Sequence, residues 1–112
     1  WEKAARGVDG RRYPWGDGFR LEFTNSIYSH PEGQKIVGVQ EFPLDESPYG
    51  VRGMGGNVRD WCADVVPTNP SMRMARGGMW TAAGLLMRPA NRVGNVTTRV
   101  STNLGFRLAL DL

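Results

Sequence analysis

Few side chains in this sequence could act as a nucleophile or bind a metal ion. The 112 residues include one cysteine, Cys62, and one histidine, His30. One imidazole cannot form a histidine-rich metal site, and a Ser-His-Asp arrangement needs a second signal that the sequence does not give. Cys62 lies in the strand-like segment DWCAD, where a single cysteine more often packs in the interior than attacks a substrate. Neither residue by itself predicts a catalytic centre.

The glycine-rich segment GVRGMGG at Gly50–Gly56 is a second candidate for chemistry. A phosphate-binding loop needs a following Lys-Ser/Thr pair between a strand and a helix, and neither feature is evident. The glycines are more typical of tight turns. The net charge is +3, but the arginines are scattered and the aromatic residues sit in WGD and DW motifs. These features argue against a nucleic-acid partner.

The most informative segment is Thr81–Asn103, because its composition is unusual. It contains no Asp, Glu, Lys, Gln or aromatic residue, and Arg88, Arg92 and Arg99 supply its only charges. Loops normally carry turn formers and solvated charges, and core elements normally carry a period. This segment shows neither pattern, which indicates that something other than folding selected its residues.

The elements that must position this segment are short. We expect a helix end at Trp1–Arg6, ended by Gly7, and an irregular connection over Phe19–Gly38. Strands are predicted at Val39–Phe42, at Val58–Cys62, around Met72 and Met74, and over Leu104–Leu110, whose alternation of apolar residues is the clearest period-2 pattern. The intervening segments Pro43–Gly56 and Asp64–Ser71 are predicted to be loops. Together these elements predict a small antiparallel sheet with long irregular loops.

Length and composition restrict the chain to one domain at most. Fifteen glycines and seven prolines predict many turns. No run approaches the roughly 20 apolar residues that a membrane-spanning helix needs. The lone cysteine leaves the cellular compartment undecided.

Six motifs occur in order along the chain: WEKAARG at its start, YPWGD, FP-D-SPYGV, M-GNV-DW, RGG-W and LGFR near its end. Together the motifs make the chain resemble the formylglycine-generating-enzyme/sulfatase-modifying-factor family. The resemblance implies an α+β, C-type-lectin-like fold of the formylglycine-generating-enzyme type. Because WEKAARG lies well inside the longer family domains, residues 1–112 are expected to form the C-terminal part of one such domain.

Formylglycine generation in this family is a copper-dependent oxidation that uses two cysteines after the GGS-aromatic motif. The resemblance places those positions at Ala82 and Met87, and the serine of the motif at Met79. An alanine methyl group cannot bind copper, and one thioether does not replace two thiolates. The chain is therefore expected to lack this copper chemistry. Alternatives that stay open are an oxidoreductase of this type, a relative of the iron-dependent sulfoxide synthases, and a catalytically inactive accessory domain.

A family calcium site is the other cofactor that the resemblance implies. Its ligands fall on Gly53, Gly56, Val58 and Asp60. Gly53 supplies no side-chain oxygen, and calcium needs several oxygen ligands. No cofactor is therefore expected, with calcium near Asp60 as the remaining possibility.

One branch of the family, the variable proteins of diversity-generating retroelements, fits the unusual segment. In that branch, mutagenesis of adenines in AAC and AAT codons gives access to fifteen residue types and excludes Met, Trp, Lys, Glu and Gln. The resemblance implies a constant frame that includes Trp80, Met87 and Arg88, and a binding set of residue types that such codons reach. We call this set the variable set: Thr81, Ala82, Ala83, Leu85, Leu86, Asn91, Val93, Asn95, Val96, Thr97, Thr98, Val100, Ser101 and Thr102.

The sequence therefore predicts a ligand-binding domain with a hypervariable surface. An apolar centre rimmed by Thr, Ser and Asn is typical of protein-binding surfaces, so the expected partner is a macromolecule, most simply a protein surface. The resemblance to this branch suggests a location on a virus particle or a cell surface. We expect Trp80 and Phe106 to pack beneath the surface, and Arg88, Arg92 and Arg107 to tie loop carbonyls and carboxylates.

Overall fold

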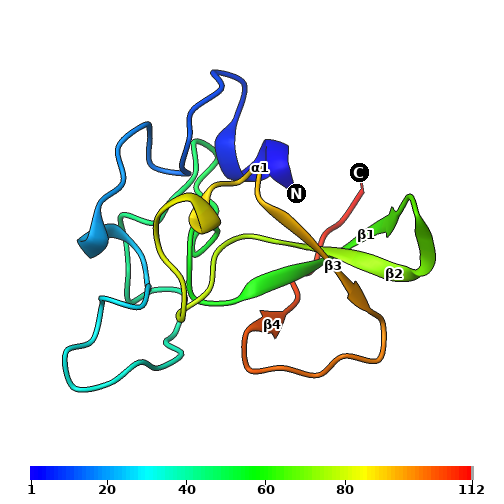
Figure 1. Ribbon diagram of the computed structural model, residues 1–112. Coiled ribbons are helices and arrows are strands. Elements are labelled where there is room, and N and C mark those ends of the chain that lie inside the picture. Colours follow the sequence, from blue (N-terminus) through cyan, green and yellow to red (C-terminus); the bar gives the residue numbers. More distant parts are fainter. Residues whose placement is uncertain (112) are drawn as a thin grey trace.

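The computed structural model describes residues 1–111, which form a four-stranded sheet joined to a large set of loops (Figure 1). The strand order is β3-β2-β1-β4; the β1–β2 and β2–β3 pairs are antiparallel, and β1 and β4 are parallel. The helices are short. In chain order the elements are α1 (Glu2–Arg6), the 3-10 helix η1 (Leu21–Phe23), β1 (Arg59–Val66), β2 (Asn69–Arg76), the 3-10 helix η2 (Gly84–Met87), β3 (Arg92–Val96) and β4 (Leu104–Gly105).

The helix α1 is held against one end of the sheet by two side-chain contacts. The indole Nε1 of Trp1 donates to Asp60 Oδ2 at 2.9 Å, and Arg76 Nη1 donates to Glu2 Oε2 at 2.9 Å. The helix ends at Gly7, which has a φ of 70° and is thus in the left-handed region that glycine adopts easily. The expected helix end at Trp1–Arg6 is therefore confirmed.

The hairpin of β1 and β2 is longer than the sequence predicted. The segment Asp64–Ser71 was expected to be a loop, but β1 continues to Val66 and β2 begins at Asn69. Pro70 is tolerated in β2 because pairing with β3 begins only at Met72, so no ladder hydrogen bond from residue 70 to β3 is required.

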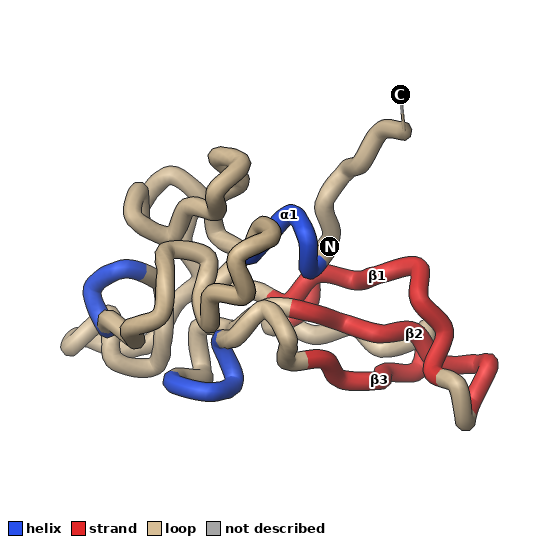
Figure 2. The backbone as a smooth tube through the Cα atoms, turned by 90° about the horizontal axis from the view of Figure 1, so that it is seen from above, coloured by secondary structure: helices blue, strands red, loops and turns tan. Residues whose placement is uncertain are grey.

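The strand predicted over Leu104–Leu110 is wrong beyond its first two residues. Only Arg59↔Leu104 and Asp60↔Gly105 are paired, and the chain then leaves the sheet (Figure 2). Phe106, Leu108 and Leu110 are 75%, 92% and 82% exposed. Alternation alone cannot fix a strand, because a strand also needs a neighbour to accept its hydrogen bonds. Phe106 therefore does not pack beneath the expected surface.

The loops over 7–58 gather on the opposite side from the sheet and contain little regular structure (Figure 2). The predicted strand at Val39–Phe42 is instead a turn, with Glu41 N donating to Gly38 O at 3.1 Å. No helix among residues 1–111 has the length and apolar character to cross a lipid bilayer.

Buried polar side chains replace secondary structure in organising these loops. Asp45 is 1% exposed and accepts hydrogen bonds from Thr24 Oγ1 and from the backbone N–H groups of Gly55 and Gly56. The side chain of Asn57 pairs with the backbone of Val37: its Oδ1 accepts from Val37 N at 3.0 Å and its Nδ2 donates to Val37 O at 2.8 Å. Buried loop backbone needs such partners because water cannot reach it.

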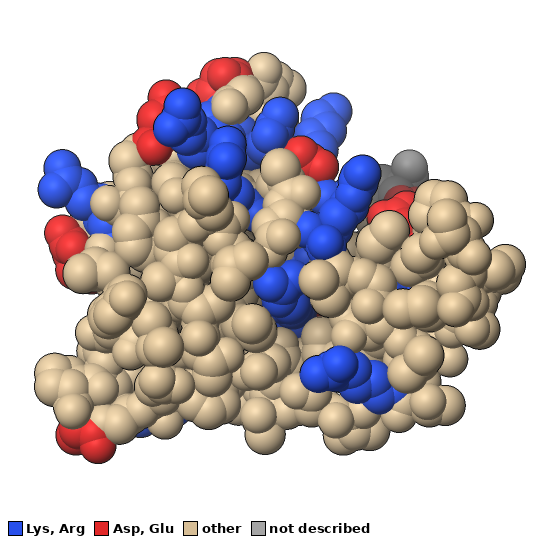
Figure 3. Space-filling model, in the orientation of Figure 1, with Lys and Arg blue, Asp and Glu red and all other residues tan. Residues whose placement is uncertain are grey.

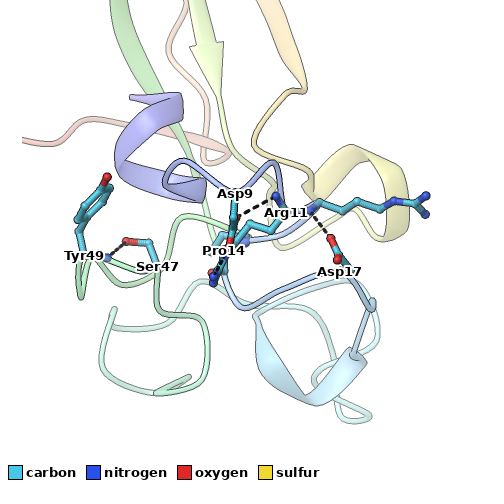
Figure 4. A network of polar contacts seen from close by, with 7 residues as sticks. Asp9, Arg11, Pro14, Asp17, Ser47 and Tyr49 are labelled. Atoms are coloured by element: carbon cyan, nitrogen blue, oxygen red, sulfur yellow. Dashed lines mark hydrogen bonds and ion pairs between the residues drawn. The ribbon is translucent and has the colours of Figure 1, made fainter.

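The turn that follows α1 is held by local polar contacts at the surface (Figure 4). Arg11 Nη2 donates to Asp9 Oδ2 at 2.7 Å, and Arg11 Nη1 donates to Pro14 O at 3.2 Å. Next to this turn, the rings of Tyr13 and Trp15 are stacked with centroids 5.3 Å apart. The YPWGD motif thus forms an aromatic turn that packs against the glycine-rich segment, since a Cβ at Gly55 would meet the Trp15 ring.

Candidate functional site

The segment Thr81–Asn103 runs from η2 through β3 into the connection to β4 (Figure 1). Two hydrogen bonds bring its separated parts together. Trp80 Nε1 donates to Thr102 O at 3.3 Å, and Asn91 Nδ2 donates to Leu86 O at 2.8 Å. The η2 turn is thereby linked to the start of β3, and the residue before Thr81 is linked to the end of the connection.

The large apolar members of the variable set are exposed. The exposed fractions are 69% for Leu85, 47% for Leu86, 42% for Val93, 48% for Val96 and 97% for Val100. Large apolar side chains elsewhere, such as Val8 and Leu108, are exposed as well, so the exposure of these five agrees with the predicted surface but does not by itself identify it.

The polar members of the set are mostly exposed or half-buried. Thr97, Thr98 and Thr102 are exposed, and Thr81, Asn91 and Ser101 are half-buried. Two expected members, Ala82 and Asn95, are 5% and 6% exposed and do not belong to an accessible surface. Ala82 is buried because its backbone joins two loops, with Ala82 N donating to Met79 O and Ala82 O accepting from Ile27 N.

The constant frame supports this segment from below. Met87 is fully buried and packs toward the glycines at 56 and 78, and Trp80 N donates to Asn57 O at 2.7 Å. β3 is paired with β2 from Arg76↔Arg92 to Met72↔Val96. The segment thus contains a strand that its sequence did not reveal, because β3 is an edge strand with a buried asparagine in place of an apolar residue.

Of the three arginines expected to tie the loops, Arg107 does so in the structure. Its Nε donates to Asp60 Oδ2 at 2.6 Å and its Nη2 donates to Gly53 O at 2.8 Å. The expectation is wrong for Arg92, whose side chain is exposed on β3, and for Arg88, whose buried Nε has no hydrogen-bond partner among the described residues.

The same contacts test the calcium site that the resemblance implied. The guanidinium of Arg107 donates to the Asp60 carboxylate, the acidic ligand expected to bind the ion, and to the backbone carbonyl of Gly53, the position at which the side-chain ligand is missing. Asp60 also accepts from Trp1 Nε1. A carboxylate already paired with a cation does not supply the oxygen cage that calcium needs, so these residues do not fit calcium.

Replacing Arg107 with alanine is expected to lower the free energy of unfolding by about 2–4 kcal/mol, since the Asp60 carboxylate would lose its cation in a 4%-exposed site. Urea denaturation followed by circular dichroism measures the change. Thr97→Ala, at an exposed position of the variable set, is the control and should change stability by no more than about 0.5 kcal/mol. Equal losses in both variants would contradict the structural role of Arg107.

The residues present do not fit the copper site of the family either. Ala82 and Met87, where the resemblance places the two cysteines, are both buried, and only Met87 carries a sulfur atom. Cys62 lies in β1, beside a cavity of about 590 Å³ that is also lined by Trp1 and Arg107. Burial raises the pKa of the Cys62 thiol, which favours the protonated form over the thiolate that copper prefers.

One buried residue next to the variable set was not singled out from the sequence. Arg59, the first residue of β1, is 5% exposed and lines a cavity together with Val93, Asn95 and Ser101. The only sequence signal was indirect: Thr81–Asn103 contains no acidic residue that could pair with this arginine.

Comparisons with known proteins agree with this geometry. Treponema denticola variable protein 1 has the same fold, with a TM-score of 0.77 and 22% identity over 95% of this chain and 43% of that one. The mouse protein "Inactive C-alpha-formylglycine-generating enzyme 2" is 38% identical over 97% of this chain. The formylglycine-generating enzyme of Streptomyces coelicolor is 30% identical over 99% of this chain.

This chain spans only part of these relatives: 40% of the mouse protein and 44% of the Streptomyces enzyme. The fold class expected from the motifs, an α+β fold of the formylglycine-generating-enzyme type, is confirmed by the likeness to solved structures. The sulfatase-modifying factor enzyme 1-like domain model matches residues 1–112, and the chain belongs to that family.

Proposed function

We propose that this chain is a ligand-binding domain that displays diversified side chains on a formylglycine-generating-enzyme-type scaffold, and that its ligand is a protein surface. The observation that carries the proposal is the exposure of Leu85, Leu86, Val93, Val96 and Val100 within a segment whose residue types fit adenine-directed mutagenesis. Exposed apolar side chains that alternate along the chain with Thr, Ser and Asn are the residue types expected of a protein-binding surface.

The scaffold separates stability from recognition. The hydrogen bonds that hold the segment come from backbone atoms and from the frame, such as Trp80 N to Asn57 O and the pairing of β3 with β2. Side chains at exposed positions can therefore be substituted without a change in the backbone conformation. In this proposal, residues 1–112 form the C-terminal part of one larger domain of the family.

A catalytically inactive accessory domain is the second candidate function. It is favoured by Ala82 and Met87 at the copper-binding positions and by the likeness to a mouse protein whose name calls it inactive. This candidate does not account for the five exposed aliphatic side chains, which we therefore assign to ligand binding.

The encoding DNA tests the diversification directly. We expect a near-copy of the stretch that encodes Trp80–Arg107, close to a reverse transcriptase gene, that differs from the coding copy only at adenines. Sequencing the locus gives the answer. Differences spread over all four bases, or the absence of a copy beside such a gene, would contradict diversification and leave the accessory domain as the function.

The tolerance of the surface gives a protein-level prediction. Simultaneous randomisation of Leu85, Leu86, Val96 and Val100 with codons ending in C or T should leave most members folded, since exposed positions usually contribute within about 0.5 kcal/mol each. Display level after a heat step measures folding.

The matched control applies the same codons to Ala82, Met87, Asn95 and Ala75, which are all buried. Most of its members should unfold, because the substitutions create cavities, overpacking or unpaired polar groups in the interior. If both libraries unfold to the same extent, the exposed residues are structural and the surface is wrongly assigned.

A further inference from the structure

A small cavity lies within the proposed binding surface, between the sheet and the connection from β3 to β4. Its volume is about 170 Å³. Sites for drug-sized ligands usually enclose roughly 300–1,000 Å³, so this cavity matches a single side chain rather than a larger molecule. Two segments line the cavity. The sheet contributes Arg59, Val93 and Asn95, and the β3–β4 connection contributes Arg99, Ser101 and Asn103.

Among residues 1–111, no side chain pairs with the guanidinium of Arg59, and one of its nitrogens is buried at this cavity. The residue is 5% exposed, its Nη1 is buried without a hydrogen bond, and no Asp or Glu among residues 1–111 forms an ion pair with it. Desolvation lowers the pKa of Arg59, and no neighbouring carboxylate offsets it. A buried nitrogen of a cation that lacks a hydrogen-bond partner is destabilising, so an acceptor supplied from outside would remove an existing penalty.

The surroundings of Arg59 also favour an anion. Arg99 contributes a second cation, and the residues that line the cavity in the described part of the chain include no Asp or Glu. The surface over β4 and the β3–β4 connection shows basic and uncharged atoms (Figure 3). Asn95 is 6% exposed and its Nδ2 makes only a long 3.5 Å contact to Val93 O, which leaves that amide available as a donor. Asn103 Oδ1 is a buried acceptor without a partner, and a flip of that amide would present a donor in its place.

We propose that this cavity takes the carboxylate of an aspartate or glutamate side chain of the protein ligand, with Arg59 as its ion-pair partner. The planar guanidinium donates two parallel hydrogen bonds to a carboxylate, which gives direction as well as attraction. This assignment rests on the proposed binding function. It adds a fixed charge beneath the changeable rim formed by Val93 and Ser101, so different variants of the surface would share one anchor.

The test titrates small probe molecules into the full chain and measures their binding from changes in the amide chemical shifts in ¹H–¹⁵N spectra. The probes are N-acetyl-aspartate methylamide, the asparagine counterpart and inorganic phosphate. The aspartate probe is expected to shift the amides of Asn95, Ser101 and Asn103, and to bind at least about tenfold more tightly than the asparagine probe, since charge-assisted hydrogen bonds are about twice as strong. Tighter binding of phosphate than of the aspartate probe, or equal binding of the two amino-acid probes, would overturn the carboxylate assignment.

Variants of Arg59 complete the test. Arg59→Gln should abolish the shifts and Arg59→Lys should retain part of the affinity, because lysine keeps the charge without the fork of donors. The matched control is Arg92→Gln, which removes the same charge from an exposed position on β3 outside the cavity and should bind the aspartate probe like the parent chain.

The stability of Arg59→Gln separates an anchor from a structural arginine. Without probe, its urea midpoint should be unchanged or higher than that of the parent chain, because the substitution removes an unpartnered buried cation. A clearly lower midpoint, or failure to fold, would show that Arg59 holds the fold and would contradict the assignment. The result for the cavity is independent of the result for the encoding DNA. If the aspartate probe binds but the locus has no copy that differs at adenines, the carboxylate site stands and diversification is rejected. If such a copy exists but the probe does not bind, diversification stands and the carboxylate site is rejected.

Discussion

Asp45→Ala is expected to lower the free energy of unfolding by about 3–5 kcal/mol, one of the two largest effects that the structure predicts for a single substitution. The Asp45 carboxylate accepts from Thr24 Oγ1, from Gly55 N at 3.0 Å and from Gly56 N at 3.2 Å. Removing it leaves three buried donors without an acceptor. Each buried donor without an acceptor lowers the free energy of unfolding by roughly 1–3 kcal/mol. Part of this loss is offset, because the variant no longer has to desolvate a carboxylate on folding.

The control for this substitution is Asp64→Ala, which removes a carboxylate from an exposed position on β1 and should change stability by about 0.5 kcal/mol or less. Urea denaturation at neutral pH compares the two variants. A loss below about 1 kcal/mol for Asp45→Ala would show that water replaces the carboxylate and that the loops over 7–58 have another source of order.

The pH dependence of stability gives a second readout for the same carboxyl group. Burial raises the pKa of Asp45 above its ordinary value of 3.8, against the opposing hydrogen bonds from Thr24, Gly55 and Gly56. The folded state therefore binds its proton more tightly than the unfolded state does. The resulting stabilisation is fully present below pH 3.8 and is lost as the pH rises through the folded-state pKa. In Asp45→Asn, which cannot titrate, this component of the pH profile should disappear.

The parts of the fold that local rules control were predicted well from the sequence. Gly7 ends α1 because a glycine adopts a positive φ without strain, and Met72 and Met74 lie in β2 as their alternation indicated. The strand over Leu104–Leu110 failed for a non-local reason. Its alternation was clear, but only two of its residues find a partner on β1.

The candidate site divides in the same way. Residue types within Thr81–Asn103 were enough to select the segment, and the exposure of Leu85 and Val100 agrees with that selection. Burial of Ala82 and Asn95 could not be predicted, because each is fixed by contacts with distant parts of the chain. Arg59 carried no signal of its own, since an arginine at the start of a strand is ordinary unless the surroundings are known to lack a carboxylate.

The frame that supports the surface depends on two backbones in direct contact, at the RGG motif and at the glycine-rich segment. A Cβ on Gly78 would collide with the carbonyl oxygen of Gly55 and would lie 3.0 Å from Met87 Cγ. The obstacle is a backbone atom rather than the end of a flexible side chain, so neither loop can give way by a rotamer change. Close approach here requires glycine for steric reasons.

Gly78→Ala is therefore expected to lower the free energy of unfolding by about 3–5 kcal/mol, at the upper end of the effects of overpacking. It should also separate the loops that place Trp80, whose backbone N–H donates to Asn57 O at 2.7 Å, and thereby weaken the exposed hydrogen bond from Trp80 Nε1 to Thr102 O. Urea denaturation measures the first effect, and the amide chemical shifts of Thr81 and Thr102 measure the second.

The matched control is Gly38→Ala, at a position with open space around the added methyl group, which should leave both readouts near those of the parent chain. If Gly78→Ala were as stable as Gly38→Ala, the two loops would not be in the close contact from which the constant frame of this surface is derived.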